Sequence, residues 1–112
     1  MTRILATILV ALPLLAAAGD SDRAPPDPRD NGPDRLDVSK WPVEHQKRYP
    51  LFETKCSKCH PLARAINAHF SGADWKRYSK RMIRRPNSGI NEEQAVELYQ
   101  FLAYFASAQG GK

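Results

Sequence analysis

The 112-residue sequence predicts an all-α fold, and two observations lead to this fold class. Near the C-terminus, apolar side chains recur at the spacing of one buried helix face. These residues are Ala95, Leu98, Leu102 and Phe105, with Phe101 beside them. No segment alternates between apolar and polar residues, as a half-buried β-strand would. The sequence also contains no internal repeat and no glycine-rich phosphate loop.

Residues 1–18 have the composition of a secretory signal peptide. Arg3 adds a positive charge, Ile4–Leu15 is apolar apart from Thr7, and Ala16–Ala18 offers the small residues of a cleavage site. We therefore expect the mature chain to start at Gly19 and to be exported to the periplasm. A membrane anchor facing the periplasm is the alternative. However, the apolar run would span only roughly 22 Å as a helix, against about 30 Å of hydrocarbon.

Residues 19–35 are rich in proline and aspartate. Such a composition buries too little apolar surface to offset the entropy lost on ordering. We expect a disordered, extended linker, which is either a simple tether or an arm that orders on a partner.

Residues 36–112 are expected to form one helical domain. Pro42 suits a helix start, Pro50 is expected to interrupt the first helix, and Pro61 is expected to separate the next one. Ser71 with Asp74, and Asn91 with Gln94, have the spacing of capping boxes. The expected helices are Val43–Tyr49, Leu51–Cys56, Leu62–His69, Ala73–Arg84 and a last helix that ends near Ala108.

The segment Cys56-Ser57-Lys58-Cys59-His60 carries the clearest chemical signal. Two thiols three residues apart lie on one side of a helical turn, where both can bond to the two vinyl groups of one haem. His60 then lies under the iron as the proximal axial ligand. C-x-x-C-H is the attachment pattern of c-type haem, so we predict one covalent haem c on Cys56 and Cys59.

Three other interpretations of the two cysteines compete with haem attachment. A thioredoxin-like pair needs a preceding strand, and none is indicated. A zinc site needs four ligands; His45 or His69 could join His60, but their spacings match no familiar zinc pattern. A disulfide would close a strained ring. The haem interpretation is favoured over all three.

An electron-transfer haem needs a second axial ligand, and methionine sulfur is one of the usual ones. Met82 is the only methionine after the expected cleavage site. Trp75, Tyr78 and Met82 share one helix face, so we expect the two aromatic side chains to pack on the haem and Met82 to bind the iron from the distal side. His69 is the runner-up and His45 is less favoured. Met82 as ordinary core is the remaining alternative.

These residues resemble the small monohaem class I c-type cytochromes. Phe52 stands four residues before Cys56, as the aromatic residue of the family's first helix does, and Leu98-x-x-Phe101-Leu102 resembles its last helix. The resemblance implies a compact cytochrome c-like helical domain, with these two helices packed crosswise beside the haem. Arg48 stands where the family often has glycine, which implies a looser or shifted crossing.

A haem with histidine and methionine on its two sides has no open position for a substrate. We therefore expect one-electron transfer by an exported carrier or a small cytochrome subunit, rather than an enzyme. The alternative is a haem-based sensor or small-ligand-binding module in which Met82 is labile or does not bind. No convincing distal acid–base pair for peroxidase chemistry is present.

The net charge of +5 is concentrated in one basic run. Its residues are Lys76, Arg77, Lys80, Arg81, Arg84 and Arg85. A patch of one sign near a haem edge steers encounters with an oppositely charged protein, so we expect a redox partner with an acidic docking surface. An exported protein has no reason to meet nucleic acid, and a membrane redox complex stays open as a partner. Arg64 or a member of the run is expected to hold a haem propionate.

Overall fold

The computed structural model describes residues 23–109. The expected signal peptide, the start at Gly19 and the final residues 110–112 lie outside this part. The described residues form only helices and connecting segments, without a strand, which confirms the predicted all-α class. The elements are the 3-10 helix η1 (Pro28–Asn31) and the α-helices α1 (Val43–Cys56), α2 (Leu62–Ile66), α3 (Gly72–Ile83) and α4 (Glu92–Ala108).

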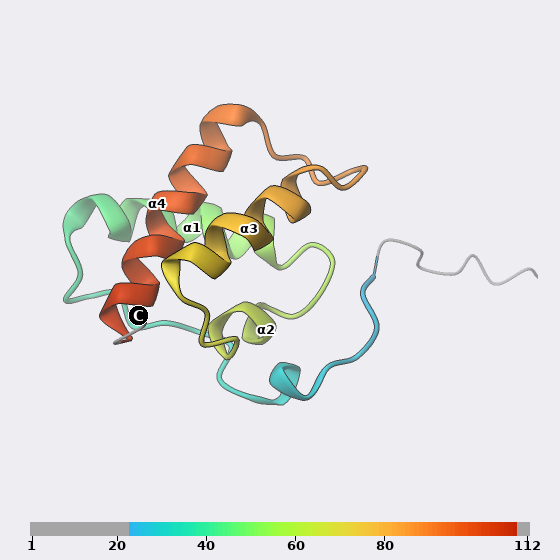
Figure 1. Ribbon diagram of the computed structural model, residues 1–112. Coiled ribbons are helices and arrows are strands. Elements are labelled where there is room, and N and C mark those ends of the chain that lie inside the picture. The colour runs from blue at the N-terminus through green and yellow to red at the C-terminus, as the bar shows by residue number, and fades with distance from the viewer. Residues whose placement is uncertain (1–22, 110–112) are drawn as a thin grey trace, which may run out of the picture.

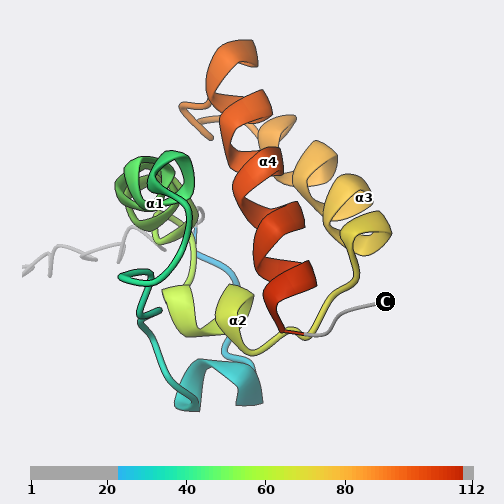
Figure 2. The ribbon, with the colours of Figure 1, turned by 90° about the vertical axis from the view of Figure 1, so that its left-hand side faces the viewer.

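Helix α4 is the common support of the fold. It packs against both α1 and α3, and in Figure 2 it runs between them. The largest fully buried side chains are Phe52 of α1 and Phe101 and Phe105 of α4. The rings of Phe52 and Phe101 have their centroids 4.9 Å apart. The face predicted from the periodicity of α4 is thus the face that forms the core.

The two predicted capping boxes are both present. The Ser71 hydroxyl accepts a hydrogen bond from the backbone N–H of Asp74 at 3.1 Å, and the Asn91 side chain accepts one from Gln94 at 2.8 Å. In each case the second residue bonds back to the first. These caps satisfy backbone donors that a helix start leaves unpaired, which explains why α3 and α4 begin here.

The expected interruption of the first helix at Pro50 is wrong. Helix α1 continues through Pro50 as one element of 14 residues. Proline removes one helical hydrogen bond, but the residues on both sides are held by packing, since Tyr49 and Phe52 both stack near Phe101. Tertiary contacts therefore outweigh the local cost. The next helix is also shorter than expected: α2 ends at Ile66, and His69 has a left-handed φ of 54°.

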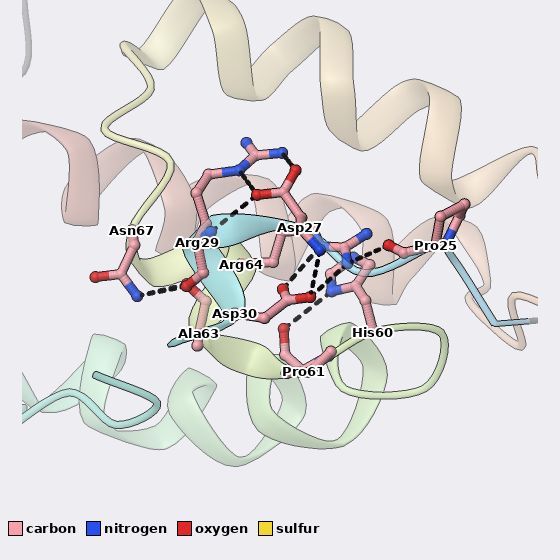
Figure 3. A network of polar contacts seen from close by, with 9 residues as sticks. All are labelled: Pro25, Asp27, Arg29, Asp30, His60, Pro61, Ala63, Arg64 and Asn67. Atoms are coloured by element: carbon pink, nitrogen blue, oxygen red, sulfur yellow. Dashed lines mark hydrogen bonds and ion pairs between the residues drawn. The ribbon is translucent and has the colours of Figure 1, made fainter. Parts of the chain in front are cut away.

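Residues 24–33, which we call the arm, fold against α2 (Figures 1 and 3). Asp27 caps η1 in a capping box with Asp30, and the arm's first backbone bond runs from the Ala24 N–H to the Cys59 carbonyl at 2.9 Å. This order differs from the disordered linker that the composition of residues 19–35 predicts. Residues 19–22 of that linker lie outside the described part.

Two side chains from α2 and its C-terminal end hold the arm. Arg64 donates to both carboxylate oxygens of Asp30, at 2.9 and 2.6 Å, and to the Pro25 carbonyl at 2.7 Å (Figure 3). Asn67 donates to the carbonyls of Arg29 and Pro33. Because Gly32 has no side chain, the chain passes Asn67 closely; a Cβ there would lie 2.5 Å from the Asn67 amide nitrogen. Polar contacts thus order a segment that has no large apolar side chain.

Candidate functional site

The site residues predicted from the sequence line one cavity. It is bounded by all four α-helices and contains about 830 Å³ of empty space, including its open mouth. All six predicted site residues line it: Cys56, Cys59, His60, Trp75, Tyr78 and Met82. From α4, Leu98 and Leu102 complete an apolar floor.

The first wall is the end of α1 and the turn that follows. Cys56 is the last residue of the helix, and both Cys56 and Cys59 are free thiols. Burial raises the pKa of the Cys56 thiol to about 12, so this side chain stays protonated at neutral pH. A redox-active cysteine needs the opposite shift, toward the thiolate. The environment of Cys56 therefore does not favour thiol redox chemistry.

The imidazole of His60 is oriented by its neighbour. Its Nδ1 lies 3.1 Å from the Pro61 carbonyl oxygen (Figure 3). Because a carbonyl only accepts hydrogen bonds, Nδ1 carries the proton, and Nε2 is the nitrogen left with a lone pair. A hydrogen bond of this kind fixes the tautomer and the ring orientation of a metal-binding histidine.

The opposite wall is the inner face of α3. Trp75 is buried, and Tyr78 and Met82 are partly buried. Phe70 joins them from the preceding loop, with its ring 4.9 Å from Trp75 and 5.2 Å from Tyr78 between centroids. The Trp75 indole nitrogen is buried without a hydrogen-bond partner. Buried polar atoms are normally paired, so this N–H lacks the acceptor that a buried donor usually has.

Two arginines lie at the edge of the cavity beside the arm. Arg29 and Arg64 both line it, and each is paired with an aspartate of the arm. The hydrogen bonds from Arg64 lower the pKa of Asp30, and those from Arg29 lower the pKa of Asp27. Arg64 is only 8% exposed, so this part of the cavity wall carries a nearly buried ion pair between Arg64 and Asp30.

The outer face of α3 and the residues after it are strongly basic. All six residues of the basic run are exposed, and five of them line a shallow depression with Pro86. Arg77 pairs with Asp74, and the Arg81 guanidinium lies 5.9 Å from the centre of the Tyr78 ring. Arg85 also reaches the cavity, so the basic run touches the cavity's rim.

The two histidines considered as alternative ligands lie elsewhere. His45 stacks on Tyr104 with ring centroids 4.2 Å apart, and burial lowers its pKa. His69 is exposed. Neither residue lines the cavity.

Sequence reasoning missed several lining residues, notably Phe70, Arg29, Lys55 and Lys58. Arg29 was assigned to a linker on composition, although Asp27 and Asp30 have the spacing of a capping box around Pro28, which a local reading would have found. No local signal marks Phe70 or the lysines.

Across residues 23–109, no three His, Cys, Asp or Glu side chains gather as a metal-binding group. No helix in the same range is long and apolar enough to cross a bilayer. Comparisons with protein-family models, curated proteins and solved structures find no match to this chain.

Proposed function

We propose that this protein transfers single electrons through one covalently attached c-type haem held in the cavity. The observation that carries the proposal is the cavity itself: thiols, imidazole, thioether and aromatic rings, chosen from the sequence, all line one space. When bound, the haem supplies one-electron chemistry at its iron. The residues around it determine how it is held and how its iron is ligated.

Cys56 and Cys59 would attach the group. Each thiol adds across one vinyl group: the sulfur bonds to one carbon and the thiol hydrogen passes to the other, so no oxidant is needed. Both thiols are free, and Cys56 is kept protonated by its burial. Two links from one turn fix the plane of the group relative to α1.

His60 and Met82 would complete the ligation. The hydrogen bond from His60 Nδ1 to Pro61 leaves Nε2 to coordinate, and Met82 lines the cavity from α3. With His60 and Met82 both bound to it, the iron would offer no site for a substrate, and a methionine sulfur ligand would raise its reduction potential. Electron transfer rather than catalysis is therefore the activity that this ligand set supports.

The remaining lining residues match the apolar ring of a haem and its propionate groups. Trp75, Tyr78 and Phe70 offer aromatic surface for its apolar part. Arg64 and the unpaired indole N–H of Trp75 are donors that propionate oxygens require. We propose Arg64, rather than a member of the basic run, as the arginine that meets a propionate.

A cytochrome c-like arrangement of the helices is part of the proposal. It is supported by the packing of α1 on α4 through Phe52 and Phe101, the pair on which the resemblance rests. Arg48 does not block this packing, because its side chain extends to Glu97 and Gln100 of α4.

We further propose that the protein works in the periplasm with an acidic redox partner. The composition of residues 1–18 and the thioether chemistry both support export, with a membrane anchor as the alternative. The exposed basic run beside the cavity rim supports an acidic docking surface.

The test is to express the full chain in a bacterial host with haem-attachment machinery. Periplasmic protein should retain one haem by mass after denaturation and acid-acetone extraction. Cys56→Ala and Cys59→Ala should each leave one thioether and a less stable holoprotein, and Ser57→Ala, between them, should behave as the wild type. A chain recovered without covalent haem would refute the proposal. Tight cyanide or carbon monoxide binding by the wild type would indicate a sensor instead.

A further inference from the structure

The mouth of the cavity lies between two segments that are distant in sequence. One is the end of α1 with the attachment turn, where Lys55 and Lys58 flank Cys56. The other is residues 84–91, the loop that joins α3 to α4 and follows Met82 (Figure 1). Both lysines and the loop residues Arg85, Ser88 and Ile90 line the cavity.

The two lysines bind this loop. Lys55 Nζ donates to the Gly89 carbonyl at 2.7 Å, and Lys58 Nζ donates to the Asn87 carbonyl at 2.8 Å. Asn87 and Gly89 have left-handed φ angles of 63° and 66°, which turn these carbonyls away from regular helix geometry. A Cβ on Gly89 would lie 3.1 Å from Lys58 Nζ, so the missing side chain leaves room for the ammonium group.

The loop is in turn connected to Met82. The Arg85 N–H donates to the Met82 carbonyl at 3.2 Å, and the Ser88 hydroxyl donates to the Ile83 carbonyl at 2.9 Å. Ser88 also accepts from the Ile90 N–H. These hydrogen bonds tie the loop to the last turn of α3, where Met82 lies.

Few other contacts join the two sides of the mouth. Helices α1 and α3 both pack on α4, and the described residues show no element packing of α1 directly on α3. The two lysine bonds are the hydrogen bonds that join residues 55–60 to residues 72–91 in the described part. The gap between α1 and α3 can thus widen without disrupting the core that each shares with α4.

We propose that Lys55 and Lys58 are positioning residues that clamp the loop 84–91 over the cavity and so hold Met82 in reach of the iron. The proposal rests on the proposed haem function. It assigns the two lysines to holding the distal ligand, while the exposed basic run on α3 serves partner docking. Each lysine bond is exposed and individually weak, but the two act on the same short loop.

The test uses haem-loaded full-length protein with both lysines replaced, Lys55→Met with Lys58→Met. The matched control is Lys40→Met with Lys47→Met, which removes the same charge from two exposed lysines whose side chains make no hydrogen bond within residues 23–109. The conservative variant Lys55→Arg with Lys58→Arg keeps two donors. The single variant Lys55→Met leaves the attachment segment untouched.

Three measurements report on the clamp. Hydrogen exchange of the backbone amides of residues 84–91 should accelerate at least about tenfold in the double methionine variant. The rate of cyanide binding to the oxidised protein should rise by a similar factor, because cyanide enters when Met82 leaves. The sulfur-to-iron charge-transfer band should be lost at lower temperature. The control should stay within about twofold of the wild type, and the arginine variant should recover most of the difference.

Unchanged exchange and cyanide rates in the double methionine variant would overturn the clamp, as would equal changes in the control. If the double variant attaches no haem, the single variant Lys55→Met tests the clamp instead, by its hydrogen-exchange and cyanide-binding rates. Covalent haem content, measured separately by mass, tests the proposed function, so failure of one proposal is distinguishable from failure of the other.

Discussion

Replacing Phe101 by alanine should remove the centre of the α1–α4 contact. Phe101 is fully buried, and its ring lies within 6 Å of three aromatic rings, those of Trp41, Tyr49 and Phe52, at 5.6, 5.9 and 4.9 Å between centroids. A Phe→Ala change in a core costs about 3–5 kcal/mol, and each aromatic pair adds about 0.5–1.5 kcal/mol beyond its buried area. We therefore expect a loss near the top of that range.

Such a loss is a large part of the roughly 5–15 kcal/mol that stabilises a typical domain. It should lower Tm by on the order of 20 °C for a domain of this size. The assay is guanidinium unfolding of the holoprotein, followed by far-UV circular dichroism, with the slope against denaturant checked for each variant. The control is Val96→Ala on the same helix, because Val96 is 54% exposed and should change stability by less than about 0.5 kcal/mol.

A loss below about 1.5 kcal/mol for Phe101→Ala would refute the packing of α1 on α4 described above. So would a loss equal to that of Val96→Ala. A double-mutant cycle with Phe52→Leu and Phe101→Leu adds a second criterion, since rings in contact should show a coupling of at least about 0.5 kcal/mol.

Three other results are expected. Met82→Ala should open one axial position, lower the reduction potential and admit cyanide, because sulfur ligation favours ferrous iron; an unchanged sulfur-to-iron charge-transfer band would exclude Met82. The second-order rate of electron transfer with an acidic copper protein should fall as salt rises, since screening limits the field to about 8 Å at physiological ionic strength. Reversing Arg81→Glu and Arg84→Glu should slow that reaction, and equal salt slopes for acidic and basic partners would contradict a docking role. The arm should stay on α2 until strong acid, because Arg64 holds the pKa of Asp30 below its ordinary value of 3.8. The ion pair is fully stabilising above that value and is lost as pH falls through the lowered pKa; amide chemical shifts of the arm that titrate above pH 3.8 would contradict this.

The elements that sequence reasoning predicted well depend on local chemistry. The starts of α3 and α4 follow from side chains three residues apart, Ser71 with Asp74 and Asn91 with Gln94, whose hydrogen bonds need nothing else from the chain. The inner face of α4 follows from its periodicity alone.

The elements that it predicted poorly depend on distant partners. The arm is ordered by Arg64 and Asn67, more than 30 positions further along the chain, and a composition average cannot include them. Helix α1 continues through Pro50 because its neighbours pack on Phe101. Local propensity describes the free-energy cost of ordering each segment. These tertiary contacts supply the stabilisation that offsets that cost.

The residues of the candidate site also fall into two groups, those that sequence spacing identifies and those that only the folded chain reveals. Cys56, Cys59 and His60 form a contiguous motif, and Trp75, Tyr78 and Met82 share a helix face, so both groups could be identified from spacing. Their meeting around one cavity depends on α4, which supports both walls. Phe70 and the two clamping lysines carry no pattern of their own and are recognised only from the folded chain.

The central place of α4 has a consequence for the order of maturation. It is the last helix along the chain, and its contact with α1 joins residues as far apart as Arg48 and Glu97, 49 positions. Contacts of such separation form late, because closing a long loop costs entropy before the contact offsets it. If the protein is exported as proposed, a chain that emerges with its N-terminus first would therefore present Cys56 and Cys59 before α4 packs against α1. The topology leaves the thiols accessible for modification in the interval when the fold is still open.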